Sequence, residues 1–216
     1  MTGYTDGRWP QVSSICDADK SLPVLDPGIQ LLVPGRSLHG PARTVLAIGD
    51  HLPVLTALAL AQPGEVLVVC TERSPRAVLG ELFATEAERR GLAGIVVDGF
   101  CRDLAGLRGV HIAVFARGTT PASGSTVKLG STPGTVSCGG VAISDGDIVV
   151  GDDDGVIAAP AERIEAALPV AHEIERAEQR VLEGLRAGRG LDTLTNYHEH
   201  VRRLEQGEPT QLTFVA

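Results

Sequence analysis

Apolar and polar residues alternate along the first half of the chain with two different periods. Short apolar runs rich in valine, isoleucine and leucine are bounded by glycine, proline or charged residues, which is typical of strands buried on both faces. The strands predicted in this way lie at residues 42–49, 64–70, 93–99 and 112–118. Between them, residues 51–62 and 77–91 place apolar side chains at helical spacing, and Gly91 is a helix stop signal. This alternation predicts an α/β core with parallel strands.

The pattern changes after Gly118. Residues 119–160 are dense in glycine, proline and serine, and their short β-branched runs show no helical period. Asp-Gly turns between such runs are typical of β-hairpins, so this stretch predicts a second β layer against the core. Helical spacing returns in residues 162–188.

The sequence divides into three parts. Residues 1–35 contain four prolines and predict an N-terminal arm with one short helix. Residues 36–160 hold the strands, helices and hairpins of the α/β core. Residues 161–216 predict C-terminal helices and a polar tail, which is either an appendage or a contact with another subunit.

Composition excludes several classes of protein. The chain carries a net charge of −8 and only 3% aromatic residues. It therefore lacks the basic surplus that displaces counterions from nucleic acid and the aromatic platforms on which bases stack. No apolar run approaches the roughly 20 residues that cross a bilayer, and the N-terminal stretch lacks the apolar region of a signal peptide. We therefore expect a cytoplasmic protein that binds neither nucleic acid nor membranes.

The cysteines and the common catalytic motifs give little support to other chemistries. Cys16, Cys70, Cys101 and Cys138 are far apart and show no C-x-x-C spacing, which disfavours a thiolate zinc site. Cys101 precedes a charged pair, but no histidine lies near it in sequence to activate a thiol. The chain also lacks the G-x-S-x-G, Walker A and G-x-G-x-x-G patterns of serine hydrolases, P-loop proteins and dinucleotide-binding proteins.

The strongest candidate for chemistry is the pair Arg102 and Asp103, which follows an expected turn at Gly99. The pair comes at the carboxyl end of a predicted parallel strand, the edge of an α/β sheet at which ligands bind. An arginine there clamps a carboxylate through paired hydrogen bonds, and an aspartate holds a hard cation such as Mg²⁺ through oxygen. The alternative is an ordinary surface ion pair in a loop.

A second candidate is the stretch GELFAT, from Gly80 to Thr85, at or near the start of a predicted helix. Free backbone amides at a helix N-terminus form a site for a small anion such as a carboxylate. Glu81 would then lie beside that site, within reach of water on a metal. The alternative is that Gly80 merely allows the helix to pack closely.

Two acidic or histidine-rich stretches are weaker candidates. The three aspartates of GDDDGVIAAP, residues 151–160, offer oxygen ligands, but Asp-Gly between apolar β runs is the usual hairpin signal, and we favour that interpretation. Tyr197 begins the stretch YHEH, in which two histidines two positions apart point to different sides of a helix. No third ligand is evident there, so we expect a solvated tail.

Five stretches considered together resemble a known family. They are GPARTV (40–45), GDHLPVLTALALAQPGEVLVV (49–69), GELFATEAERRGLAGIVVDGFCRD (80–103), VFARGTTP (114–121) and GGVAISDGDIVVGDDDGVIAAP (139–160). In this order and approximate spacing they resemble the RraA-like family, which includes the 4-hydroxy-4-methyl-2-oxoglutarate aldolases and the regulator of ribonuclease activity. Some such sequences have been called demethylmenaquinone methyltransferases, but no glycine-rich methyl-donor loop is visible here.

The resemblance implies a fold and an assembly. The family fold is α/β, a three-layer β/β/α swivelling-type domain, here followed by a C-terminal helical extension. Family members assemble as a homotrimer or as a pair of trimers, a hexamer. In the aldolase branch an Mg²⁺ or Mn²⁺ site lies at a subunit boundary and acts on a small 2-oxo acid.

The resemblance also implies roles for residues. Asp103 corresponds to the direct metal ligand, Glu81 acts on the metal through a water, and Arg102 clamps the pyruvyl group. The backbone amides around Glu81, Leu82 and Phe83 hold the carboxylate of the substrate. The substrate-binding residues implied are thus Gly80, Glu81, Leu82, Phe83 and Arg102. Together with the catalytic pair Arg102 and Asp103, they imply a class II pyruvate aldolase, whose stabilised enolate also serves oxaloacetate decarboxylation.

The sequence departs from the aldolase pattern at two places. The pattern has a further acid three positions after the aspartate of Arg-Asp, where this chain has Gly106. Support for the metal is then weaker, or comes from another residue such as Asp98 or from an acid of a neighbouring subunit. The segment 70–81, CTERSPRAVLGE, also replaces a stretch that is usually glycine-rich.

Two alternatives to a lyase remain. The first is a non-catalytic regulator that binds a ribonuclease or another protein and has a vestigial Arg-Asp site. Gly106 in place of the acid favours this alternative. The second is a mobile carrier domain resembling the phosphohistidine carriers, suggested by the stretch 144–160, although the expected histidine in an exposed turn is missing. Retention of Arg102, Asp103 and Glu81 favours the lyase.

Overall fold

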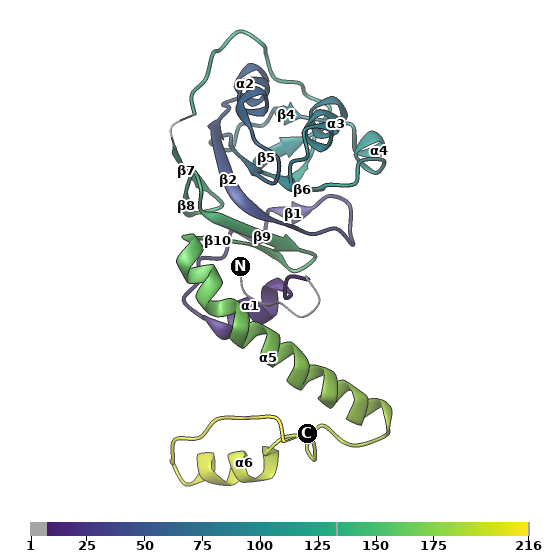
Figure 1. Cartoon of the computed structure of the whole chain (residues 1–216), viewed down its shortest axis with the longest axis vertical. Coiled ribbons are helices and arrows are strands. Elements are labelled where there is room, and N and C mark those ends of the chain that lie inside the picture. Colours follow the sequence, from purple (N-terminus) through teal and green to yellow (C-terminus); the bar gives the residue numbers. More distant parts are fainter. Residues whose placement is uncertain (1–7, 133, 216) are drawn as a thin grey trace.

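The protein is described from a computed structural model, which defines residues 8–132 and 134–215. Figure 1 shows helices over one face of a mixed sheet and a second β layer on the other face. The strands are β1 (Gln30–Leu31), β2 (Leu38–Leu46), β3 (Val66–Cys70), β4 (Ala77–Leu79), β5 (Gly94–Cys101), β6 (Ala113–Thr119), β7 (Thr135–Cys138), β8 (Val141–Ser144), β9 (Ile148–Asp152) and β10 (Gly155–Ala159). The helices are α1 (Val12–Ala18), α2 (Leu52–Leu60), α3 (Glu81–Arg89), α4 (Leu104–Leu107), α5 (Ala161–Arg186) and α6 (Tyr197–Glu205). The three-layer β/β/α architecture predicted from the sequence is confirmed.

The main sheet has the strand order β1-β6-β5-β3-β2-β9-β10, with β4 added at the end of β5. Strands β2, β3, β5 and β6 are parallel to one another, whereas β1 joins β6 in antiparallel fashion. The long strand β2 belongs to both β layers: residues 42–46 pair with β3, and residues 38–41 pair antiparallel with β9. The carboxyl ends of the parallel strands therefore meet at one edge.

The core explains the unbroken apolar runs in the sequence. All five residues of β3 are buried, because alternate side chains face different layers. Leu67 and Val69 pack under the helices, whereas Val66 and Val68 pack under the hairpin of β7 and β8. Each such fully buried aliphatic side chain contributes about 1.5–3 kcal/mol relative to an exposed one.

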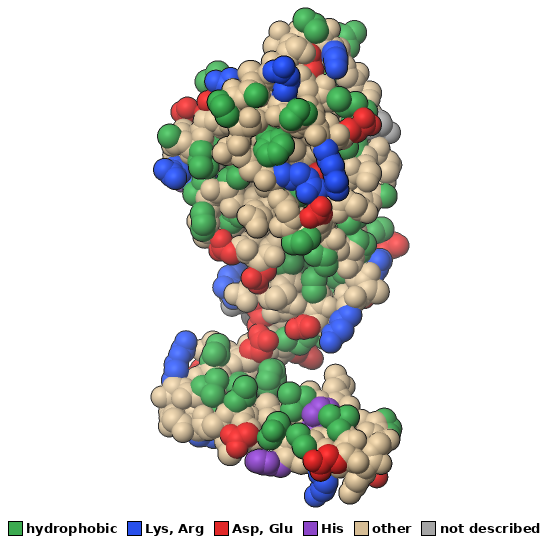
Figure 2. Space-filling model, turned by 180° about the vertical axis from the view of Figure 1, so that it is seen from behind, with side chains coloured by type: hydrophobic (Ala, Val, Ile, Leu, Met, Phe, Trp, Pro, Cys, Tyr) green, Lys and Arg blue, Asp and Glu red, His purple; other side chains and the backbone are tan. Residues whose placement is uncertain are grey.

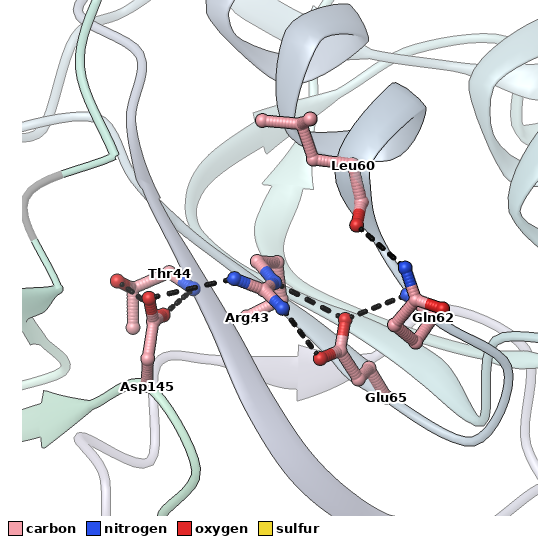
Figure 3. A network of polar contacts seen from close by, with 6 residues as sticks. All are labelled: Arg43, Thr44, Leu60, Gln62, Glu65 and Asp145. Atoms are coloured by element: carbon pink, nitrogen blue, oxygen red, sulfur yellow. Dashed lines mark hydrogen bonds and ion pairs between the residues drawn. The ribbon is translucent and has the colours of Figure 1, made fainter.

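A polar network ties the two β layers together (Figure 3). Arg43 of β2 donates to both carboxylate oxygens of Glu65, just before β3, over 2.7 and 3.1 Å. Its other guanidinium nitrogen lies 3.7 Å from Asp145 in the turn between β8 and β9. The amide and the hydroxyl of Thr44 donate to the same aspartate. The network fixes the point at which β2 passes from one layer to the other.

Two boundaries differ from those predicted. The helix expected at 77–91 begins only at Glu81, because residues 77–79 pair with Phe100 and Cys101 as β4. No turn occurs at Gly99: β5 continues to Cys101, and its register with β6 shifts between Val97 and Phe100. In both cases pairing with a neighbouring strand overrides the local sequence signal.

The C-terminal helices form an extension, as expected. Helix α5 starts against α1 and the β9–β10 hairpin, burying Ile164 and Leu168, and then runs away from the body toward α6 (Figure 1). Leu194 packs on Gly184 near the end of α5. From the other side, Figure 2 shows that α6 and the end of α5 form a lobe joined to the body by a narrow connection. Hydrophobic side chains lie on the surface of this lobe. None of the helices described is long and apolar enough to cross a membrane.

Candidate active site

The pairing of β4 with β5 brings the two candidate stretches together. Because the strands are parallel, Gly80 after β4 and Arg102 after β5 leave the sheet side by side. The amide of Arg102 donates to the carbonyl of Leu79 over 2.9 Å, which extends the pairing to the last residue before Gly80. The sequence could not indicate this contact, because β4 was hidden in the helical pattern.

Gly80 is required for the close approach of the two stretches. A β-carbon on Gly80 would lie 2.5 Å from Oδ2 of Asp103 and 2.8 Å from Cγ of Arg102. Its φ of −157° is ordinary extended backbone, so the requirement is for space and not for an unusual conformation. Gly80 thus does more than allow general helix packing, because it leaves the space that the side chains of Arg102 and Asp103 occupy.

The backbone of Asp103 is held in the left-handed region, with φ 58° and ψ 44°. Residues other than glycine are uncommon there and cluster at functional sites, although aspartate and asparagine tolerate the region best. The Nε atom of Arg102 lies 3.1 Å from each carboxylate oxygen of Asp103, and both side chains are more than one-third exposed. An exposed pair of this kind contributes little to stability, so both charges are available to a ligand.

Helix α3 begins at this edge with its first amides free. Glu81, Leu82 and Phe83 occupy the first turn, where amides have no acceptor within the helix. The side chain of Leu82 is 81% exposed, so nothing large covers the end of the helix. The predicted anion site is therefore a true helix N-terminus. The carboxylate of Glu81 lies against Gly106 of α4, within 2.1 Å of the place of a β-carbon on that glycine.

A pocket of about 240 Å³ opens beside the pair. It is lined by Arg102, Asp103, Leu104, Thr119, Thr120 and Pro121. The two threonines and the proline belong to the stretch VFARGTTP but had no assigned role in the sequence analysis. The available signal was their place at the end of β6, the neighbour of β5, where Thr120 donates its amide to the carbonyl of Cys101.

The segment that begins with the pocket residues Thr119, Thr120 and Pro121 is held further along by the turn between β2 and α2. We call residues 119–128 the strap. Ser125 of the strap donates its hydroxyl to Asp50 over 2.6 Å, and the amides of Val127 and Lys128 donate to the same oxygen. Burial alone would raise the pKa of Asp50, but these bonds and one from the amide of Leu52 hold that pKa well below its usual value.

His51 makes a second anchor of the strap. Its Nδ1 lies 2.8 Å from the carbonyl oxygen of Val78, and its Nε2 lies 2.9 Å from Oγ of Ser123. A carbonyl only accepts, so Nδ1 carries a proton, and in the neutral ring Nε2 accepts from the hydroxyl of Ser123. The ring also stacks on Phe83 at 5.6 Å. His51 therefore joins β4, α3 and the strap, a role that its position in sequence did not suggest.

The donor set fits a hard divalent cation that keeps several waters. Among the residues described, no three histidine, cysteine or acidic side chains are gathered as ligands. Asp103 lines the pocket, and the carboxylate of Glu81 lies against Gly106 of α4, the helix that follows Asp103. Mg²⁺ is usually held by one or two carboxylates together with water and substrate oxygens, so the chemistry of this donor set fits such an ion.

The remaining candidates lie elsewhere or have structural roles. Asp98 faces the other side of β5, where it accepts from Arg117 and from the amide of Gly139, so the structure does not bring it to Glu81. Cys101 is fully buried, and burial raises the pKa of its thiol to about 12, which favours the unreactive thiol.

The acidic turn and the histidine pair are accounted for by local structure. Asp152 accepts from the amide of Val12, and Asp153 accepts from the amide of Gly35, so the turn between β9 and β10 holds the N-terminal arm. His198 lies 3.5 Å from Asp192, and His200 lies 3.2 Å from Thr210. These contacts agree with the hairpin and tail interpretations.

Comparison with known proteins identifies the family. The profile of the RraA-like family (Aldolase/RraA) matches residues 12–158, so the chain belongs to this family. A relative from Halalkalibacterium halodurans, provisionally named a 4-hydroxy-4-methyl-2-oxoglutarate aldolase, is 39% identical over 173 residues, which cover 77% of this chain and 80% of the relative.

Two solved structures share the fold. One, from Geobacillus kaustophilus HTA426, is called an S-adenosylmethionine:2-dimethylmenaquinone methyltransferase; it is 35% identical, has a TM-score of 0.66 and aligns over 69% of this chain and 94% of its own. The other, from Streptomyces coelicolor, is called an unusual member of the RNase ES inhibitor RraA family; it is 30% identical, has a TM-score of 0.67 and aligns over 77% and 88%. The family therefore carries both enzyme and inhibitor names.

Proposed function

We propose that this protein is a divalent-metal-dependent lyase that cleaves a 2-oxo acid to pyruvate, of the 4-hydroxy-4-methyl-2-oxoglutarate aldolase or oxaloacetate decarboxylase type. The observation that carries the proposal is the meeting of Arg102 and Asp103 with the free N-terminus of α3 across Gly80. A cationic fork, a carboxylate and free amides beside one pocket suit a small 2-oxo acid. The name of the 39% identical relative supports the same activity.

The amides of Glu81, Leu82 and Phe83 would bind the carboxylate of the substrate at the helix N-terminus. Arg102, released from Asp103, would donate to the 2-keto oxygen and stabilise the negative charge that develops on it. Thr119 and Thr120 line the pocket and offer hydroxyl groups to the rest of the substrate. Together these groups would orient the bond to be broken within a pocket that fits a small acid.

Asp103 directly, and Glu81 through a water, would hold Mg²⁺ or Mn²⁺, which supplies Lewis-acid polarisation of the keto group when bound. In the reaction, the bond between C3 and C4 breaks and its electron pair forms the enolate of pyruvate. The C4 fragment leaves as a second carbonyl compound after losing its hydroxyl proton, or as CO₂ from oxaloacetate. Water carries the proton from the C4 hydroxyl to C3 in the aldol cleavage and supplies a proton to C3 in the decarboxylation, which completes pyruvate. Arg102 then no longer faces a charged enolate oxygen.

The proposal extends to assembly and location. Three or six copies of the chain would form a homotrimer or hexamer with the metal site near a subunit boundary, in the cytoplasm. A second candidate function is regulation of a ribonuclease by protein contact, which the name of the Streptomyces coelicolor structure favours. In that case Arg102 and Asp103 would be a vestigial pair.

The test is pyruvate release, coupled to lactate dehydrogenase, from oxaloacetate and from 4-hydroxy-4-methyl-2-oxoglutarate. We expect turnover with Mg²⁺ or Mn²⁺, none with EDTA, and none for Asp103→Ala. Asp17→Ala is the matched control, because Asp17 is an exposed acid on α1, which packs against α5 and lies away from α3 and α4 (Figure 1). No turnover from the folded, Mn²⁺-saturated wild type would contradict the lyase, and inhibition of a ribonuclease by the same sample would support the regulator.

A further inference from the structure

We infer that Gly106 is a positioning residue: the lack of a side chain there determines where the carboxylate of Glu81 lies. The consequence for cation binding rests on the proposed function, whereas the spatial relationship does not. Nothing in the sequence pairs these two residues, since one starts α3 and the other lies inside α4.

The geometry is close and specific. A β-carbon on Gly106 would lie 2.1 Å from Oε2, 2.2 Å from Cδ and 2.7 Å from Cγ of Glu81. The end of the glutamate side chain therefore occupies the volume that any side chain at position 106 would need. Helix α4 holds Gly106 in this place, because the amide of Leu107 donates to the carbonyl of Asp103 over 3.0 Å.

The contact is one half of a reciprocal arrangement. Glu81 follows Gly80, and its carboxylate lies on Gly106; Asp103 precedes α4, and its carboxylate lies on Gly80. Each acid thus reaches across to the glycine of the opposite segment. A carboxylate at each crossing brings both proposed cation-binding groups to the junction of α3 and α4.

This arrangement gives Gly106 a role that differs from backbone flexibility. Its φ is not in the left-handed region, so alanine is compatible with the backbone. The atoms that an added methyl would meet belong to the far end of a flexible side chain, which moves more cheaply than backbone. Gly106→Ala should therefore leave the fold intact and expel the Glu81 carboxylate from its place.

The experiment is a double-mutant cycle on the full-length chain, with Mn²⁺ affinity measured by calorimetry. Wild type, Gly106→Ala, Glu81→Ala and the double variant are compared. We expect Gly106→Ala to weaken Mn²⁺ binding about tenfold in the wild type and not at all in the Glu81→Ala background, since the affected carboxylate is then already gone. Gly109→Ala is the matched control, because its methyl would meet only the carbonyl of Gly106, at 3.3 Å.

Two results would overturn the inference. Unchanged Mn²⁺ affinity in Gly106→Ala, when Glu81→Ala itself weakens Mn²⁺ binding, would show that the place of Glu81 does not depend on the glycine. An equal loss in both backgrounds would show that alanine disturbs α4 or Asp103 and acts without Glu81. Turnover measured on the same four proteins should follow Mn²⁺ affinity.

A readout without metal separates this inference from the proposed function. Alanine is a better helix former than glycine, but in the wild type it must also displace Glu81. Urea unfolding in EDTA should therefore show a larger gain in stability from Gly106→Ala in the Glu81→Ala background than in the wild type. Equal gains would refute the spatial relationship. Failure of the wild type to bind Mn²⁺ or to turn over substrate would refute the lyase. The urea measurements on the four proteins would still test whether Gly106 determines the place of the Glu81 carboxylate.

Discussion

The carboxylate of Asp103 lies against the backbone of Gly80, with Oδ2 2.5 Å from the position that a β-carbon on Gly80 would take. This contact joins the segment after β4 to the segment after β5, and so joins the N-terminus of α3 to the Arg-Asp pair. It exists because β4 adds to the end of β5 in parallel, so that the two chains leave the sheet together.

Gly80→Ala should disrupt the site with little effect on the fold. The extended backbone at Gly80 accepts alanine, but the methyl group would push away Asp103 and Arg102. We expect at least a tenfold loss of pyruvate release and of Mn²⁺ affinity, with the urea midpoint nearly unchanged because both displaced side chains are more than one-third exposed. Gly109→Ala provides the comparison, and wild-type activity in Gly80→Ala would show that the close contact has no catalytic value.

Asp103→Asn separates charge from backbone conformation. Asparagine tolerates the left-handed region about as well as aspartate, so stability should stay within about 0.5 kcal/mol of the wild type. Asp103→Ala places a less suited residue at φ 58° and should cost about 1 kcal/mol more. Both variants should lose turnover and Mn²⁺ binding. Urea unfolding and calorimetry check the two effects, and retention of tight Mn²⁺ binding by Asp103→Asn would remove this carboxylate as a ligand.

The hydrogen bond between His51 and Ser123 should hold the strap in the position in which it lines the pocket. Ser123→Ala removes it directly. His51→Asn also removes it but keeps a donor for the carbonyl of Val78, in the place of Nδ1. We expect each variant to raise KM for the 2-oxo acid roughly threefold to tenfold with a smaller change in kcat, since the strap carries Thr119 and Thr120.

The double variant with both changes should be no worse than His51→Asn alone, because that change already deletes the hydrogen bond to Ser123. Ser13→Ala, at an exposed position of α1, controls for loss of a serine hydroxyl. If the increases in KM caused by the two changes multiply in the double variant, His51 and Ser123 act separately.

Asp50 should make stability depend on pH in the acid range. Its folded-state pKa is held below the usual 3.8, so its contribution is fully present above about pH 4 and is lost as the pH falls below that value. Asp50→Asn should lose on the order of 3 kcal/mol at pH 7, since three strap donors would then face an amide. Urea unfolding at pH 7 and at pH 3 checks this. The gap between wild type and variant should narrow at pH 3, and a constant gap would contradict the assigned role.

The buried strands were predictable because their sequence signal is strong and local. Residues 64–70 and 93–99 contain the apolar runs VLVVC and GIVV, which are typical of a strand covered on both faces, and β3 and β5 lie there. The hairpins after residue 134 and the long helix α5 were predictable for the same reason, since turn residues and helical spacing act over a few positions. The start of α3 was not, because Val78 and Leu79 fit the helical spacing while belonging to β4.

The residues proposed for the site were named from sequence, but their arrangement was decided by the tertiary structure. Order along the chain and chemical type determined that Arg102, Asp103 and Glu81 are present near the ends of predicted elements. That Asp103 lies on Gly80, that Glu81 fills the space beside Gly106, and that His51 holds Ser123 depends on which chain segments cross. Such contacts join residues far apart in sequence and arise only when burial of the apolar strands fixes the sheet order, so no local pattern records them.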